Sequence, residues 1–389
     1  MRGNRVWAEI NLSAVRHNVA LLREHLAEET KLLAVVKADA YGHGALPFAW
    51  TAVESGAAML GVGDSNEAIE LREGGITHPI LILGAIFEEE IQRLVEYDIS
   101  VTVHSADLLP ILDREARRCG KSLAVHMKVD TGMGRLGAAP RSAVGIARDI
   151  SSRDNLVFEG LSTHLSSTGS GERDWTRRQL QRFQWVVKSL EAIGIRPPVI
   201  HAVNSAGIFD HPEARFDMVR SGVALYGIDR GVLTEHRVPV QPVLSLKSRV
   251  VYLKGLPAGS DIGYDRRYRT REATRIATCP VGYNDGYPHQ LSNRSEVLVH
   301  GKRAPVVGTV TMDYLMIDVG SVPELRVGDE VTLIGRDGNE EIRVEDLARL
   351  IPTIPHEITC GLGKRVKRVC VEKAASVPEE PARFQRGVA

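Results

Sequence analysis

The sequence has few cysteines, no excess of either charge and no long apolar run. Its 389 residues include 4 cysteines without CxxC spacing, so we expect reduced thiols and no metal site. Lysine and arginine (49) balance aspartate and glutamate (49), which argues against a protein whose main role is to bind nucleic acid. A membrane-spanning helix needs roughly 18 consecutive apolar residues, and because no such run occurs we expect no membrane span.

A secretory signal is also missing from the start of the chain. The basic first residues lead into Val6-Trp7-Ala8-Glu9-Ile10 rather than into an apolar core. A signal peptide needs such a core, so we expect a cytoplasmic protein. Aromatic residues make up only 5% of the chain and 9 of them are tyrosines, which gives weight to tyrosines that occur within motifs.

What is present is a regular alternation over the first half of the chain. Short apolar runs alternate with stretches of helical periodicity such as 12–26, 106–118 and 174–192. The runs are residues 32–36, 59–62, 80–83, 101–103, 123–127, 157–161, 199–202 and 217–219. Continuous apolar strands separated by helices indicate a parallel sheet covered on both faces. Eight such units predict a (β/α)8 barrel rather than an open sheet.

Beyond residue 240 the pattern changes to short β-rich segments separated by glycine, proline and aspartate. These segments are residues 244–252, 274–279, 296–299, 304–310, 314–319 and 330–334. They predict a mostly-β second domain, with the boundary within residues 231–242. The length of 389 residues by itself allows two or three domains.

Polar side chains stand where several of the apolar runs end. They are Lys37 after the first run, Lys128 and Arg135 after the fifth, His164 after the sixth, Asn204 and Ser205 after the seventh, and Arg220 and Gly222 after the eighth. Barrels of this kind carry their active sites at the carboxyl ends of the strands. We therefore expect these side chains to converge on one site.

Lys37 directly follows five apolar residues, so its amine is predicted to lie in a partly dry barrel mouth. Desolvation lowers the pKa of a lysine, and the free amine can form a Schiff base with an aldehyde. The small residues after the seventh and eighth runs suit a phosphate, which such barrels often bind there. Together they suggest pyridoxal 5′-phosphate. Each feature also has an ordinary structural interpretation when it is taken alone. Lys37 is then a lysine that extends from a strand end into solvent, and the small residues form a tight turn.

Seven motifs now carry a resemblance to bacterial alanine racemases. They are AVVKADAYGHG, KVDTGMGRLG, STHLSS, NSAG, VRSGVALYG, PVGYNDGYPH and GTVTMDYLMIDV, in the family's order and over roughly residues 5–372. The resemblance implies a pyridoxal-phosphate-dependent (β/α)8 barrel at residues 12–240 and a β domain at residues 241–389, which residues 1–11 join. It also implies a homodimer that racemises alanine and supplies D-alanine for peptidoglycan.

The resemblance implies two catalytic residues on opposite faces of the substrate. Lys37 matches the lysine that holds the cofactor and moves the α-proton on one face. Tyr264, in IGYDRRYR, matches the second acid/base, supplied from the other subunit to the opposite face. Racemisation needs this arrangement because the proton must leave one face and return to the other. His164 matches a histidine of the hydrogen-bond network around that tyrosine. Without the resemblance, Tyr264 would be interpreted as an ordinary tyrosine of the β domain and His164 as an ordinary core histidine.

Further matches imply a set of binding residues. Arg220 matches the partner of the pyridine nitrogen, and because arginine stays protonated it disfavours a protonated ring. Arg135 matches a contact to the phenolic oxygen of the cofactor, and Lys128 matches a lysine that can be carbamylated to orient it. The remaining expected cofactor contacts are Tyr41, His164, Asn204, Ser205, Gly222, Val223 and His356; Arg135, Met312 and Asp313 are expected to bind substrate.

One position departs from the family. A tyrosine usually stands in a segment like TIPYE, where this chain has His356. Histidine is smaller and titrates near neutral pH, so a wider entrance that admits serine as well as alanine is an alternative function. A pyridoxal-phosphate decarboxylase of related architecture is disfavoured by Arg220, because those enzymes use an acidic partner for the ring nitrogen. A non-catalytic cofactor-binding protein resembles the barrel alone.

Overall fold

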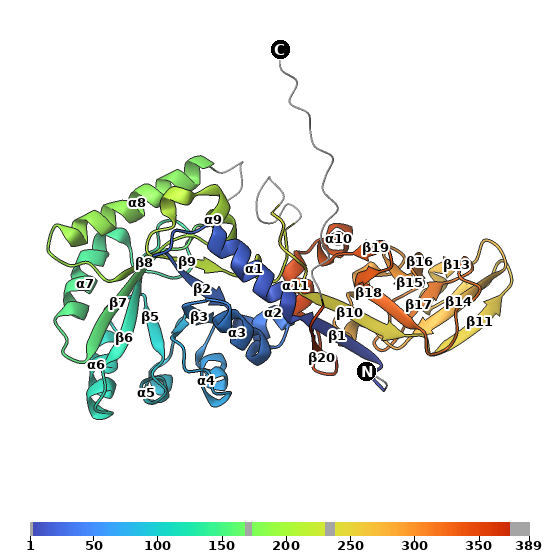
Figure 1. Cartoon of the computed structure of the whole chain (residues 1–389), viewed down its shortest axis with the longest axis horizontal. Helices are drawn as coiled ribbons and strands as arrows, with labels where there is room; N and C mark the ends of the chain where they lie inside the picture. The colour runs from blue at the N-terminus through green and yellow to red at the C-terminus, as the bar shows by residue number, and fades with distance from the viewer. Residues whose placement is uncertain (1–2, 168–172, 230–237, 374–389) are drawn as a thin grey trace, which may run out of the picture.

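Within residues 3–167, 173–229 and 238–373, the part of the chain that the computed structural model describes, eight parallel strands close into a barrel (Figure 1). The strands are β2 (Lys31–Val35), β3 (Met59–Val62), β4 (Ile80–Ile82), β5 (Ser100–Val103), β6 (Leu123–Lys128), β7 (Leu156–Ser162), β8 (Val199–His201) and β9 (Met218–Ser221). Each strand overlaps one of the eight apolar runs. The predicted (β/α)8 barrel is therefore confirmed.

Helices connect the strands and cover the outside of the barrel (Figure 1). They are α1 (Leu12–Glu24), α2 (Lys37–Gly42), α3 (Ala45–Glu54), α4 (Ser65–Glu73), α5 (Ile91–Glu96), α6 (Leu109–Arg118), α7 (Ala143–Ser151), α8 (Arg173–Glu191) and α9 (Ser205–Asp210). The first helix is capped by Asn11, whose side chain accepts a hydrogen bond from the Ser13 backbone N–H at 3.2 Å. Its Val15, Val19 and Leu22 side chains are buried at the spacing of one helical face.

The second half of the chain forms a mostly antiparallel sheet beside the barrel (Figure 1). In the described residues its strand order is β11-β14-β17-β16-β15-β18-β10-β1-β20, with β19 paired to β18. The bounds are β1 (Val6–Asn11), β10 (Leu244–Arg249), β11 (Tyr252–Leu256), β14 (Thr274–Cys279), β15 (Glu296–Val299), β16 (Lys302–Val307), β17 (Leu315–Asp318), β18 (Glu330–Asp337), β19 (Glu340–Ile342) and β20 (Lys367–Val371). The mostly-β second domain is therefore confirmed.

Both ends of the described chain enter this sheet. β1 pairs antiparallel with β10 and parallel with β20, so the first strand lies among the last ones. Residues 231–237 of the predicted boundary lie outside the described residues.

Several short elements of the second half have no counterpart in the predicted pattern. They are the hairpin of β12 (Asp261–Ile262) and β13 (Tyr268–Arg269), the helices α10 (Val344–Leu350) and α11 (Pro355–Cys360), and the 3-10 turns at Tyr264–Arg266, Tyr283–Asp285 and His289–Leu291. Elements of two to seven residues are too short to show a period. In the described part of the chain no helix has the length and apolar character that crossing a membrane requires.

Candidate active site

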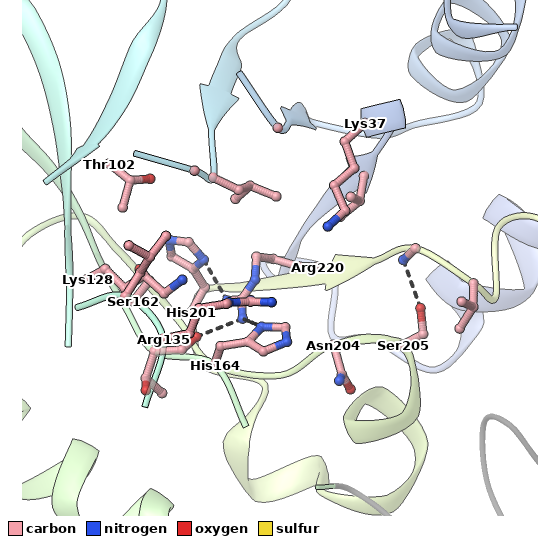
Figure 2. A pocket seen from close by; sticks show the side chains of 18 of the residues that line it. Lys37, Thr102, Lys128, Arg135, Ser162, His164, His201, Asn204, Ser205 and Arg220 are labelled. Atoms are coloured by element: carbon pink, nitrogen blue, oxygen red, sulfur yellow. Dashed lines mark hydrogen bonds between the residues drawn. The ribbon is translucent and has the colours of Figure 1, made fainter. Parts of the chain in front are cut away.

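A cavity of about 460 Å³ opens at the carboxyl ends of the barrel strands (Figure 2). Eleven predicted residues line it, and they come from widely separated parts of the sequence. They are Lys37, Tyr41, Lys128, Arg135, His164, Asn204, Ser205, Arg220, Gly222, Val223 and His356. The strand ends therefore meet in one place, as strands of a parallel barrel require.

Lys37 begins α2, which turns the wrong way for an ordinary helix. Ala38, Asp39, Ala40 and Tyr41 have φ angles of 54°, 52°, 51° and 53°, in the left-handed region. The turn is held from outside: Glu67 Oε1 accepts from the Ala38 backbone N–H at 2.6 Å. In Figure 2 the Lys37 side chain reaches into the cavity and directs its amine toward Arg220.

Arg220 is buried and fixed from several sides. Its Nη2 donates to the backbone carbonyls of Thr163 and Ala202 at 2.7 and 2.8 Å and lies 3.1 Å from His164 Nδ1. Its Nη1 lies 2.9 Å from His201 Nδ1. Burial lowers the pKa of Arg220 to about 10, so the group remains cationic at neutral pH.

His164 is held neutral by its surroundings. Burial, reinforced by the positive charge of Arg220, lowers the pKa of His164 to about 2. An arginine only donates hydrogen bonds, so Nδ1 of His164 must accept and its proton stands on Nε2. The imidazole therefore offers one N–H donor to a neighbouring group.

Lys128 stands among positive charges. Burial and then the charges of Arg220 and Arg135 lower the pKa of Lys128 to about 8. The loop that carries Arg135 is shaped by Asp130, whose Oδ1 accepts from the backbone N–H groups of Gly132 and Met133 at 2.9 and 2.8 Å.

One end of the cavity carries the neutral hydroxyl groups of Ser205 and Tyr41, which suit a phosphate. Ser205 Oγ accepts from the Gly222 backbone N–H at 2.8 Å and brings the loops after β8 and β9 together. A Cβ added at Gly222 would lie 2.8 Å from Tyr41 Oη, so only glycine leaves this hydroxyl its place. Burial raises the pKa of Tyr41 to about 12, which keeps the hydroxyl protonated. His356 Nδ1 is buried without a hydrogen-bond partner.

Three predicted residues lie elsewhere. Tyr264, Met312 and Asp313 do not line the cavity. The Tyr264 side chain, in the Tyr264–Arg266 turn, is 71% exposed, and Met312 is 52% exposed. Asp313 accepts from Arg365 Nη2 at 2.7 Å, which ties the Met312 loop to the turn before β20. Within one chain these residues face outward.

Several residues that build the site are not among those predicted from the sequence. Thr102, Ser162 and His201 line the cavity, and Glu67 supports the lysine turn. Thr102 and His201 lie within predicted strands, where a two-residue alternation marks one face. The alternation of side chains along a strand could therefore have indicated Thr102 and His201. No pattern in the sequence indicates Glu67, which lies on α4.

Family models and known proteins agree on one family. The model described as "Alanine racemase, N-terminal domain" matches residues 10–230, and "Alanine racemase, C-terminal domain" matches residues 243–370. An alanine racemase of Symbiobacterium thermophilum is 45% identical over 362 residues, which cover 93% of this chain and 96% of the relative.

Solved structures agree with this. Alanine racemase of Clostridium difficile 630 matches with a TM-score of 0.91 and 33% identity, covering 96% of this chain and 97% of its own. Histidine racemase of Leuconostoc mesenteroides subsp. sake matches with a TM-score of 0.87 and 29% identity, covering 96% and 99%.

Proposed function

The chain belongs to the alanine racemase family, and on that premise we propose how it interconverts L-alanine and D-alanine. Lys37 binds pyridoxal 5′-phosphate covalently, and the loops around Ser205 and Gly222 hold its phosphate with Tyr41 and His356. The observation that carries this is the convergence, in one cavity, of a lysine amine, a buried arginine and a phosphate-suited end.

The proposal assigns the remaining lining residues by their place around that group. Arg220 meets the ring nitrogen, Arg135 the phenolic oxygen, and His164, Asn204 and Val223 complete the contacts. When bound, pyridoxal 5′-phosphate supplies an electron sink that acidifies the α-hydrogen of an amino acid. Arg220 cannot hand a proton to the ring at neutral pH because it binds its own too tightly, which limits side reactions that need a stronger sink.

Two residues move the proton. Lys37 Nζ takes or gives it on one face, and Tyr264 Oη of a second copy of the chain does so on the other. The neutral His164, with its proton on Nε2, is suited to donate to a tyrosine oxygen at the cavity. Met312 of the second copy binds the substrate carboxylate through its backbone N–H, with Asp313 beside it and Arg135 opposite.

A homodimer with shared sites is part of the proposal. Its support is the outward position of Tyr264. Among the described residues Tyr41 is the one tyrosine that lines the cavity, and the proposal assigns it to the phosphate. A cytoplasmic location fits the four free cysteines Cys119, Cys279, Cys360 and Cys370. Supply of D-alanine for peptidoglycan is the role that we propose there.

Lys128 carries a carbamate in this proposal. Three cations, Arg220, Arg135 and Lys37, disfavour its charged amine. Carbamylation would replace that amine by a negative group among them. The carbamate would then orient Arg135 toward the cofactor.

The test is proton exchange with solvent. Incubation with L-alanine in D2O should give D-alanine with deuterium at the α-carbon, and the protein should show the visible absorbance of lysine-bound pyridoxal phosphate. Lys37→Ala should abolish both, because Lys37 is the amine that the proposal assigns to the aldehyde, while the surface control Lys121→Ala should keep both. Release of CO2 from alanine, or turnover retained in Lys37→Ala, would overturn the assignment.

A broader amino-acid racemase that also accepts serine is the second candidate. His356 stands where the family usually has tyrosine, and its Nδ1 is buried without a partner. The histidine racemase of Leuconostoc has the same fold, so in that protein the fold serves a larger side chain.

His356→Tyr should lower kcat/KM for serine relative to alanine, because the larger ring narrows the cavity. The measurement is the ratio of the two kcat/KM values in wild type and variant. An unchanged ratio would refute the broader specificity and leave alanine racemisation in place.

A further inference from the structure

A chain of hydrogen bonds runs behind Arg220 into the barrel. His201 Nδ1 lies 2.9 Å from Arg220 Nη1, and His201 Nε2 lies 2.9 Å from His126 Nδ1. His126 Nε2 lies 2.9 Å from Glu159 Oε2, which also accepts from Ser100 Oγ at 2.9 Å. Figure 2 shows its first link, between Arg220 and His201. None of His126, Glu159 and Ser100 is needed for the steps proposed above.

The chain connects the two ends of the barrel. Arg220 and His201 stand at the carboxyl ends of β9 and β8, whereas Ser100 is the first residue of β5. Both histidines are fully buried, and the Glu159 side chain is 28% exposed. Away from the cavity, the Glu159 carboxylate is therefore the part of this chain that reaches toward water.

The protons in this chain have only one possible order. A guanidinium donates and never accepts, so His201 Nδ1 accepts and its proton stands on Nε2. Nε2–H donates to Nδ1 of His126, whose own proton must then stand on Nε2 and point at Glu159. That hydrogen bond lowers the pKa of Glu159 against the opposing effect of burial, so the carboxylate accepts in its ionised form.

The backbone is adapted to this arrangement. Val125 pairs with Phe158 but His126 pairs with Gly160, so β7 carries one extra residue, Glu159, at this point. A bulge of this kind redirects a side chain. Here it turns the Glu159 side chain toward the barrel interior, where it meets His126. A Cβ at Gly160 would lie 2.1 Å from His126 Nδ1, so the imidazole requires glycine on the neighbouring strand.

The charges around Arg220 show what the chain supplies. Its charged neighbours at the cavity, Lys37, Lys128 and Arg135, are basic, and among the described residues no carboxylate contacts its guanidinium. Lys31 is the cation near the other end, beside Glu159. The ionised end of the chain is therefore the nearest negative group to which Arg220 is hydrogen-bonded, through two polarised imidazoles.

We propose that Glu159, His126 and His201 form a positioning relay that fixes both histidine tautomers and, through them, the direction in which the Arg220 guanidinium faces the cofactor ring. The inference rests on the proposed function for the role of Arg220. The order of protons within the relay does not depend on it. These are positioning residues, because the proposal gives them their effect through Arg220 and not through contacts of their own with the cofactor.

The first test is the tautomeric state of the histidines. Protein labelled with 15N at its 13 histidines is examined by NMR between pH 6 and 8, and His126→Gln and His201→Gln assign the signals by their loss. His126 and His201 should both carry the proton on Nε2, and His201 should stay neutral because burial lowers its pKa well below the ordinary value. A proton on Nδ1 of either ring would overturn the relay whether or not the protein racemises alanine.

The second test separates the relay from mere packing. Glu159→Leu removes the acceptor, whereas Glu159→Gln keeps an oxygen that can accept from His126. The leucine variant should disorder the His126 signals, bind pyridoxal 5′-phosphate more weakly by equilibrium dialysis and lose about tenfold or more in kcat, since misplacement by about 1 Å costs up to about a hundredfold. The glutamine variant should keep the wild-type signals and most of the activity.

Two outcomes complete the experiment. A leucine variant with wild-type cofactor affinity and kcat would refute the relay, because the arginine would then be positioned without it. Absence of racemisation in the wild-type protein, together with the expected tautomers, would instead refute the proposed function and leave the relay intact. Far-ultraviolet circular dichroism verifies folding, and should the leucine variant not fold, the wild-type tautomers still decide.

Discussion

At the scale of single residues, the site holds several positively charged groups close together, and these groups repel one another while no ligand is bound between them. Lys128 is the sharpest case, because its neighbours Arg135 and Arg220 are both cations. With a pKa of about 8, about a tenth of its amines are neutral at pH 7, which is about a few hundred times the fraction of an ordinary lysine. Only the neutral amine reacts with CO2.

Carbamylation of Lys128 should therefore increase as the pH rises from 6 to 9. The direction follows from the lowered pKa, since protonation below pH 8 removes the reactive amine. The measurement is the carbonyl signal in 13C NMR after equilibration with labelled bicarbonate. Lys128→Arg should lose that signal while the surface variant Lys121→Arg keeps it, and a signal that is absent or independent of Lys128 would exclude the modification.

The site residues that the pattern of apolar runs predicts without the family resemblance are those at strand ends. Lys37, His164 and Arg220 follow apolar runs, and the barrel architecture brings all such positions to one mouth. Glu67 and Glu159 were beyond this reasoning. Glu67 acts through backbone N–H groups on another element, and Glu159 faces inward only because an extra residue shifts the register of β7.

At the scale of elements, the turn after Lys37 adopts a backbone conformation that its residues do not favour. Alanine favours right-handed helix, and a left-handed residue with a Cβ costs about 1–2 kcal/mol. Four consecutive residues nevertheless have positive φ in α2. Glu67 and Asp39 oppose this cost, since Asp39 Oδ1 accepts from the Ala45 backbone N–H at 2.7 Å. Tertiary contacts therefore decide this element, which is why local propensity does not predict it.

Replacing alanine by glycine should distinguish this turn from an ordinary helix. Ala38 and Ala20 are both exposed, but Ala38 lies in the left-handed turn and Ala20 in the right-handed α1. Ala20→Gly should lower the free energy of unfolding by about 1 kcal/mol. Ala38→Gly should leave it unchanged or raise it, because glycine removes the left-handed strain. Urea unfolding measures both, and an equal loss in the two variants would contradict the strain.

The strands show the opposite case. Their apolar runs are long enough to carry a pattern, and all eight barrel strands lie where the pattern places them. The helix α11, which carries His356, has only six residues, and the sequence pattern does not predict it. It packs against the lysine turn, with the rings of His356 and Tyr41 centred 6.0 Å apart. A local pattern thus predicts regular elements but not their meeting points.

At the scale of the whole molecule, the second domain both completes the fold and presents residues of the proposed site on its outer surface. Its sheet takes in the start of the chain through β1 and its last described strand, β20. It also presents Tyr264 and Met312 outward, away from the cavity of the same chain. We infer that this outward surface completes the cavity of a second copy, which the order of motifs along one chain does not reveal without the family resemblance.

Subunit mixing tests this arrangement. Lys37→Ala and Tyr264→Phe homodimers should each be nearly inactive, because every site lacks one of its two proton carriers. In a heterodimer of the two, one site combines intact Lys37 from one subunit with intact Tyr264 from the other. Random exchange makes about half of the dimers mixed, each with one of two sites intact, so the recovered activity should approach about a quarter of wild type.

The control is exchange of each variant with itself, which should recover nothing. Exchange itself is verified by native mass spectrometry of differently tagged subunits. If each site used Tyr264 of its own chain, neither subunit of the mixed dimer would hold a complete pair, and no activity would return. Recovery thus depends on the tyrosine crossing between subunits, and the outward position of Tyr264 leads us to expect it.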